Sequence, residues 1–205
     1  MPFYNPHGEL NPLPHARTFG EESRMVLLAM DCILNGEKAV YASSELTTGP
    51  RLYRLLREWG LKDAKALKAA LGEEEFQRLI WDPNAVEADA FARELRSRIP
   101  GRPMVVTPAP FLAPGWQQEE YLAFWETAIR TRFRALYFSD DWEWSHGCTF
   151  EFAVAWDAGL PTYTQAGQIL GLDEGRALIV RAAEILEAEG FDASGLRQNL
   201  ARLSR

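Results

Sequence analysis

The sequence has only two cysteines, a deficit of basic residues and no long apolar run. Cys32 and Cys148 alone among 205 residues exclude a disulfide framework and are typical of a reducing cytoplasm. A formal net charge of -7 argues against binding to a nucleic acid polymer, because such binding needs clustered Lys and Arg. Neither a charged and apolar leader nor an apolar run near about 18 residues is present, so neither export nor a membrane span is predicted. We therefore expect a cytoplasmic protein.

Common motifs of metal and cofactor chemistry are also missing. The sequence has no Cys/His cluster with zinc spacing, no P-loop and no G-x-G-x-x-G, so it predicts neither a metal nor a cofactor. Glu143-Trp-Ser-His-Gly147 resembles a broken G-x-S-x-G motif, with Glu143 in place of the first glycine. A nucleophile elbow needs its serine directly after a strand, whereas several polar residues precede Ser145. A serine hydrolase is therefore not expected.

The apolar pattern alternates between helices and strands. With 47% apolar residues, the chain is long enough for one main domain with additions. Helical spacing covers 19–35, 50–59, 62–71, 73–80, 83–99, 117–133, 147–158, 173–189 and 194–203. Short apolar runs predict strands at 39–42, 104–107, 134–139 and 161–164. This alternation predicts an α/β fold with three α/β/α layers, a mainly parallel sheet and helical additions.

Proline and glycine divide the chain into segments. Four prolines within residues 1–16 predict an extended arm, followed by an α/β domain over 17–165 and a helical extension over 166–205. Asp82-Pro83 predicts a new helix start, with the acid as N-cap and proline at the first helical position. The preceding helices, residues 50–82, form an insertion that we expect over the mouth of a pocket as a lid or a partner surface.

The segment from Ser145 to Glu151 is the main candidate site, because it follows a strand and enters a helix. Ligands of open α/β folds bind at the carboxyl ends of the strands. A glutamate in the first helical turns can also serve only to complement the helix dipole. Further polar residues in the same loop favour a site over that alternative: Asp140, Asp141, Glu143, Ser145 and His146.

The other residues of this loop have simpler interpretations. Trp142 and Trp144 are suited either to stacking on a base or to covering a hydrophobic edge, and the sequence leaves both roles open. For His146 we favour a structural or rim role over acid–base chemistry. Cys148 is expected to be a small packed residue.

Three segments carry a family resemblance. They are Val40-Tyr-Ala-Ser-Ser-Glu-Leu-Thr-Thr-Gly49, the stretch from Asn84 through Met104-Val-Val-Thr-Pro108, and Trp142-x-x-Ser145-x-Gly147-x-x-x-Glu151-x-x-x-Ala155-x-x-x-Gly159-x-Pro161. Together they resemble the nucleoside 2-deoxyribosyltransferase family, including its branch of nucleoside 5′-monophosphate N-glycosidases. The third segment is the most specific. The resemblance implies a flavodoxin-like or Rossmann-like fold of the deoxyribosyltransferase type.

The resemblance also implies roles for individual residues. Glu151 matches the family's nucleophile, which attacks the anomeric carbon of the sugar. Glu126, counted back from the strand that follows it, matches a helix carboxylate that handles the base or a sugar hydroxyl. Tyr41 matches a strand-end tyrosine that orients the nucleophile or the sugar. The substrate contacts that we expect are Ser43, Ser44, Glu45, Thr47, Thr48, Trp142, Ser145 and Gly147.

Glu45 departs from the family pattern. It stands where the nucleotide branch has a small hydroxyl residue near the phosphate. A carboxylate facing that position would repel a phosphate dianion at a cost of several kcal/mol. Glu45 facing Glu151 would therefore favour a nucleoside, whereas Glu45 turned away would allow a phosphate.

The resulting hypothesis is cleavage or transfer of an N-glycosidic bond in a nucleoside or nucleotide, through a covalent intermediate on Glu151. One alternative is a non-catalytic nucleotide-binding or sensing module, and the other is an interaction protein in which the added helices matter. A homo-oligomer is expected, with the apolar faces of 173–203 available for assembly.

Overall fold

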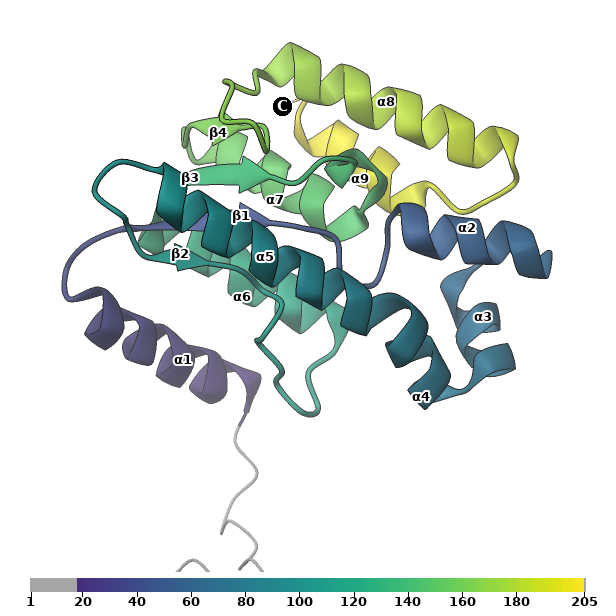
Figure 1. Cartoon of the computed structure of the whole chain (residues 1–205), viewed down its shortest axis with the longest axis horizontal. Coiled ribbons are helices and arrows are strands. Elements are labelled where there is room, and N and C mark those ends of the chain that lie inside the picture. The colour runs from purple at the N-terminus through teal and green to yellow at the C-terminus, as the bar shows by residue number, and fades with distance from the viewer. Residues whose placement is uncertain (1–17, 205) are drawn as a thin grey trace, which may run out of the picture.

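The fold is built on a parallel sheet in the middle of the chain's three layers (Figure 1). The computed structural model describes residues 18–204, so the arm predicted at 1–16 lies outside the described residues. The strands are β1 (Ala39–Ser43), β2 (Val105–Val106), β3 (Phe133–Phe138) and β4 (Thr162–Tyr163). All pairings are parallel, in the order β2-β1-β3-β4. The α/β/α prediction is therefore confirmed.

Alternation along β1 assigns its side chains to two faces. Tyr41 points toward Trp125 of α6 (Gln118–Arg132), with ring centroids 5.3 Å apart. Ala42 belongs to the cluster on the other face, where it packs with Phe91 and Leu95 of α5 (Asp82–Arg98). The helix α7 (His146–Asp157) lies on the same side as α6, where its residues join the core around Tyr41. Consecutive residues of one strand thus contact different helix layers.

The helical additions share the main core. The insertion contains α2 (Pro50–Trp59), α3 (Ala64–Leu71) and α4 (Glu73–Phe76), and the C-terminal part contains α8 (Leu172–Ala188) and α9 (Ser194–Arg202). Leu56 and Leu67 from the insertion and Ile179 and Leu196 from the C-terminal helices belong to the same buried cluster as Tyr41. The apolar faces of 173–203, which we expected to serve assembly, are therefore buried within the chain.

The predicted helix start at Asp82-Pro83 is wrong. The backbone is helical without interruption from Glu73 to Arg98, and a π-helical turn, η1 (Gln77–Trp81), joins α4 to α5. Within this turn the N–H of Asp82 donates to the carbonyl oxygen of Gln77. Pro83 has no N–H, and in a regular α-helix its ring would press on the preceding turn. The wider π turn explains how the helix continues through this proline.

Two helices pack closely where α8 crosses α7. Gly175 in α8 is buried, and a Cβ built on it would lie 2.2 Å from Cζ of Phe152, a fully buried residue of α7. No side chain other than hydrogen fits there without moving the ring. The glycine therefore sets the distance between the two helices.

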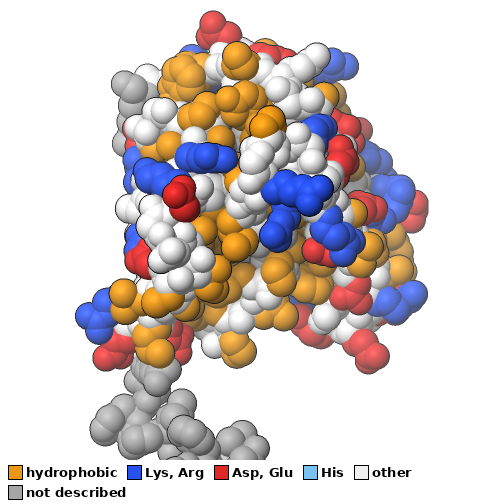
Figure 2. Space-filling view, turned by 60° about the vertical axis from the view of Figure 1, so that its left-hand side comes forward, with side chains coloured by type: hydrophobic (Ala, Val, Ile, Leu, Met, Phe, Trp, Pro, Cys, Tyr) orange, Lys and Arg blue, Asp and Glu red, His pale blue; other side chains and the backbone are white. Residues whose placement is uncertain are grey.

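The helix α1 (Phe19–Leu34) lies outside α6 and is mostly exposed. Its Met25, Leu28 and Ile33 are exposed apolar residues. In Figure 2 the left-hand side of Figure 1 comes forward, and apolar side chains lie among charged ones on the face that is shown. Within residues 18–204, no helix has both the length and the apolar character that crossing a membrane requires.

Candidate functional site

Glu151 lies in the second turn of α7, at the carboxyl end of the sheet. The helix begins there because the Ser145 side chain caps it, its Oγ accepting a hydrogen bond from the N–H of Cys148 at 3.4 Å. The Glu151 side chain is held inward, and the residue is only 6% exposed. A carboxylate buried to this extent requires hydrogen-bond donors.

Two residues of β1 supply those donors. The hydroxyl of Tyr41 donates to Glu151 Oε1, and the hydroxyl of Ser43 donates to Glu151 Oε2, each over 2.6 Å. Tyr41 and Ser43 are two positions apart on the strand, so their side chains leave the same face of the sheet. The structure thus brings together three of the predicted site residues.

The surroundings raise the pKa of the Glu151 carboxyl. Burial raises it and the hydrogen bonds from Ser43 and Tyr41 lower it, and the net change is from the ordinary value of 4.5 to about 7. Burial and the neighbouring Glu151 charge raise the pKa of Tyr41 well above its ordinary value, so the phenol stays protonated and remains a donor. Near neutral pH the carboxyl is therefore poised between its acid and ionised forms, as is typical of a reactive group.

A group of hydroxyls lies beside this carboxylate. Thr48 Oγ1 and Ser145 Oγ are 3.1 Å apart, and the N–H of His146 donates to Thr48 Oγ1 over 3.2 Å. Ser44 is 8% exposed, and its Oγ has no hydrogen-bond partner among the residues that the structure describes. A buried hydroxyl without a partner costs about 1–3 kcal/mol, which a ligand or a water would recover.

These residues line a cavity of about 460 Å³ that also contains Glu151. Its size falls within the range of roughly 300–1,000 Å³ that is usual for small-molecule sites. Ser44, Thr47, Thr48, Ser145 and Gly147 form its polar part. The remainder of the wall is mainly apolar and consists of Leu46, Trp81, Pro108, Phe111, Leu112, Tyr121, Leu122 and Trp125, together with the amide of Gln118.

The residues of this apolar wall were not among the site residues predicted from the sequence. Its residues come from the loop after β1, the π turn, the loop after β2 and the helix α6. Tyr121, Leu122 and Trp125 have the helical spacing of one face, but that spacing is the same for a core and for a cavity wall. Trp81, the insertion's contribution to the cavity, had no distinguishing signal.

Glu45 points away from the cavity that contains Glu151. Its carboxylate accepts a hydrogen bond from Ser139 Oγ at 3.1 Å and lines a second, acidic cavity beside α5, together with Asp140 and Asp141. Burial, with the charges of Glu87 and Asp141, raises the pKa of Glu45. The predicted contact of Glu45 with the substrate next to Glu151 is therefore not met. Its charge still acts on Cys148, which lines the first cavity.

Glu126 is also elsewhere, which corrects the role expected for it. It forms ion pairs with Arg130 in its own helix and with Arg202 in α9, and it does not line the cavity. The α6 residues that line the cavity are Gln118, Tyr121, Leu122 and Trp125, all nearer the start of the helix. The Glu126 carboxylate lies toward α9, where it pairs with Arg202.

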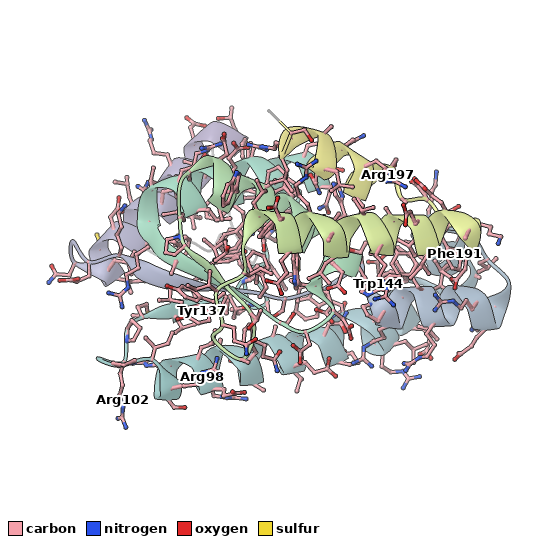
Figure 3. The ribbon with its side chains drawn as sticks, turned by 90° about the horizontal axis from the view of Figure 1, so that it is seen from above. Arg98, Arg102, Tyr137, Trp144, Phe191 and Arg197 are labelled. Atoms are coloured by element: carbon pink, nitrogen blue, oxygen red, sulfur yellow. The ribbon has the colours of Figure 1, made fainter. Side chains whose placement is uncertain are left out.

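Both tryptophans of the loop have structural roles in this chain. Trp142 is buried, with its ring centroid 4.8 Å from Phe138 and 4.9 Å from Phe152. Trp144 contacts Tyr53 of α2, whose ring in turn packs on Phe191. Figure 3 labels Trp144 and Phe191. Trp142 was expected to contact the substrate, but it covers the core, and Trp144 fixes the insertion to the domain.

His146 and Cys148 match their predicted roles. A Cβ built on Gly195 of α9 would lie 2.7 Å from Cδ2 of His146, so the imidazole packs directly against that glycine. Burial lowers the pKa of His146. Cys148 is buried, and burial raises the pKa of its thiol well above the ordinary value. The imidazole is therefore mostly unprotonated near neutral pH, and the thiol keeps its proton.

Removing the Tyr41 hydroxyl should change the titration of Glu151. Tyr41→Phe deletes one of two donors to the carboxylate, and a hydrogen bond to a charged group contributes about 1.5–3 kcal/mol. Without it the ionised form is less stable, so we expect the pKa of Glu151 to rise by about 1 or more above the starting value. Carbon NMR of the labelled Glu151 carboxyl measures this pKa directly. Tyr163→Phe, which leaves Glu151 untouched, is the control, and an unchanged pKa in Tyr41→Phe would contradict the assigned hydrogen bond.

Among the described residues, no group of three or more His, Cys, Asp and Glu side chains is placed to hold a metal ion. Comparison with family models, curated proteins and solved structures found no match to this chain.

Proposed function

We propose that this protein cleaves or transfers the N-glycosidic bond of a nucleoside or nucleotide through a covalent glycosyl intermediate on Glu151. One observation carries the proposal: a buried carboxylate at the wall of a cavity, with one hydroxyl donor on each oxygen. Retaining displacement at a sugar requires a carboxylate held in a fixed orientation against the anomeric carbon. The sequence resemblance to the deoxyribosyltransferase family supports the same chemistry.

The proposed reaction has two displacements. A Glu151 oxygen attacks the anomeric carbon, the bond from that carbon to the base nitrogen breaks, and its electron pair leaves with the base. Water or a second base then attacks the same carbon and releases the Glu151 carboxylate. Tyr41 and Ser43 keep the carboxylate oriented through both steps.

A 5′-phosphate is the favoured feature of the substrate. Thr48 and Ser145 offer hydroxyls, and Ser44 Oγ lacks a partner among the described residues. Gly147 and Cys148 contribute to the cavity at the N-terminus of α7, where the helix dipole favours an anion. Glu45 lines the second cavity and not this one, so its carboxylate does not contact a phosphate bound here, although its charge still reaches Cys148.

The test is covalent trapping with a 2-deoxy-2-fluoro nucleoside and with its 5′-monophosphate. We expect a mass increase equal to the fluorinated sugar or sugar phosphate, on the peptide that contains Glu151, and faster labelling by the monophosphate. Ser145→Ala should reduce the preference for the monophosphate, since a hydroxyl donor to an anion contributes about 1.5–3 kcal/mol. Glu151→Gln is the negative control.

Each failure of this experiment has its own meaning. Binding of both compounds without any adduct or turnover would contradict the catalytic proposal and favour the nucleotide-binding alternative. An adduct on another residue would contradict the role of Glu151. Equal labelling by both compounds would remove the argument for a phosphate and leave the glycosidic chemistry in place.

Assembly into a homo-oligomer is a separate part of the proposal. Because the C-terminal helices are buried within the chain, the exposed Met25, Leu28 and Ile33 of α1 offer a more suitable apolar surface. A cytoplasmic location is proposed on the cysteine usage alone.

A further inference from the structure

The aromatic wall begins next to the reactive carboxylate. Trp125 contacts Tyr41, with ring centroids 5.3 Å apart, and Tyr41 donates to Glu151. Phe111 contacts Trp125 in turn, with an interplanar angle of 79°. Flat aromatic surfaces beside the anomeric centre suit a heterocyclic leaving group, while the hydroxyls from Thr47 to Ser145 suit the phosphate.

Among the described residues that line the cavity, none is placed to protonate the leaving base. Among the described residues that line this cavity, the titratable side chains are Glu151, Tyr121, His146 and Cys148. Glu151 is the nucleophile of the proposed reaction, so it must be ionised when it attacks.

Tyr121 is occupied by its own backbone contacts. Its hydroxyl accepts a hydrogen bond from the N–H of Ala113 at 2.9 Å and donates to the carbonyl oxygen of the same residue at 3.1 Å. The single proton of the phenol is therefore already engaged. A base that took it would have to break this closed pair of contacts.

His146 and Cys148 are positioned for packing instead of proton transfer. The imidazole lies against Gly195, on the α9 side of the helix start. The Cys148 thiol is buried and a weaker acid than an ordinary thiol. Glu126, the carboxylate that the resemblance assigned to the base, is paired with Arg130 and Arg202 outside the cavity.

We propose that the substrate's base is one that departs as a stable anion, such as an oxo-pyrimidine, and not an amino-base that must be protonated in order to leave. This inference rests on the proposed function and names the class of its leaving group. The carbon–nitrogen bond breaks with its electron pair on the base, giving a heterocyclic anion and the glycosyl ester of Glu151. The water that resolves the ester gives its hydroxyl to the sugar and its proton to the base anion or to solvent, so charge and atoms balance.

The experiment compares leaving groups of nearly equal shape on one sugar phosphate. Uracil and cytosine differ at one exocyclic position, and 5-fluoro, 5-bromo and 5-methyl uracils vary the acidity of the leaving nitrogen. We expect the single-turnover rate of glycosyl-enzyme formation to rise steeply with that acidity. Cytosine should react slower than uracil by about 10²–10⁴-fold, the size of a general-acid contribution that this site does not supply.

The pH profile provides a second readout. With the unsubstituted uracil substrate, whose N3–H keeps its proton over this range, we expect one ascending limb, from ionisation of Glu151, and no descending limb up to about pH 8, since an essential acid would produce one. His146→Gln should show the same slope against leaving-group acidity as the wild type, because His146 donates no proton to the base in the proposed reaction.

Three outcomes would overturn the inference: equal rates for uracil and cytosine, no dependence on acidity within the uracil series, or a descending limb that the His146 variant abolishes. Each of these still requires a covalent adduct on Glu151, so each leaves the proposed function standing. Failure of every substrate to react or to form an adduct would instead overturn the proposed function, and this inference with it.

Discussion

Glu151→Gln is expected to abolish glycosyl-enzyme formation and, at alkaline pH, to make the protein more stable. Glutamine retains the shape of glutamate and can contact both the Tyr41 and the Ser43 hydroxyls, so the cavity is preserved. Its amide is not a nucleophile, and we expect kcat/KM to fall by about 10⁴-fold or more, as for other covalent catalysts that lose the attacking group. Rates with a nucleoside 5′-monophosphate measure this loss.

The gain in stability follows from the raised pKa. Burial lifts the pKa of Glu151 from 4.5 to about 7, so the folded state holds this proton more tightly than the unfolded state does. The contribution of the protonated carboxyl is fully present below the unfolded pKa and is lost as the pH rises through the folded pKa. Above that pH the wild-type protein carries a penalty of about 3 kcal/mol, which the neutral amide does not have.

Urea unfolding of both proteins at several pH values measures the difference. The variant and the wild type should have similar free energies of unfolding near about pH 4.5, and the variant should be more stable by up to about 3 kcal/mol near pH 8.5. Glu126→Gln is the matched comparison, because it removes the same charge from a site outside the cavity and should lack this pH dependence. A Glu151 variant that is equally destabilised at every pH would contradict a buried, raised carboxyl.

Gly175→Ala is expected to destabilise the protein, although alanine is normally the better helix former. In an exposed helix the substitution stabilises by up to about 1 kcal/mol. At Gly175 the new methyl would overlap the Phe152 ring, with a Cβ at 2.2 Å from Cζ and 2.6 Å from Cε1. We expect a net loss of about 1–3 kcal/mol in the free energy of unfolding, the usual cost of overpacking a core.

Gly20→Ala offers a control for the same change in another helix. A Cβ built on Gly20, in α1, has nothing within 4 Å, so that variant should be neutral or slightly more stable. Thermal and urea unfolding of the two variants isolate the effect of the ring. If Gly175→Ala were as stable as Gly20→Ala, α8 could not be packed on Phe152 as the structure has it.

The secondary structure could largely be predicted, because it depends on local periodicity. Helix and strand boundaries agree with the apolar pattern to within about 2 residues at most ends, the usual uncertainty of such boundaries. The parallel sheet followed from the alternation of helices and strands. Asp82-Pro83 failed because its capping signal competed with a helix that accommodates proline through a π turn.

The site was predicted where a regular strand or a helix start fixed the direction of side chains. Tyr41 and Ser43 reach Glu151 because they share one face of β1. Glu45 lies beyond the end of that strand, where alternation no longer determines the direction of a side chain. Glu126 was misplaced because the sequence does not reveal which stripe of α6 faces the cavity. These two errors, and that of Trp142, which covers the core, concern orientation and not chemistry.

The π turn determines which residues of the helix contact the insertion and which contact the sheet. A π turn adds a residue to one helical turn, so the residues before it are rotated relative to those after it. Phe76 and Ile80 can thereby face the cluster around Leu56 and Leu67, while Phe91 and Leu95 face the sheet. One continuous helix, from Glu73 to Arg98, thus packs on two clusters that lie on different sides of it. Deleting a single residue between Gln77 and Trp81 would rotate Phe76 away from Leu56 and Leu67 and would take Trp81 out of the cavity, without altering any strand.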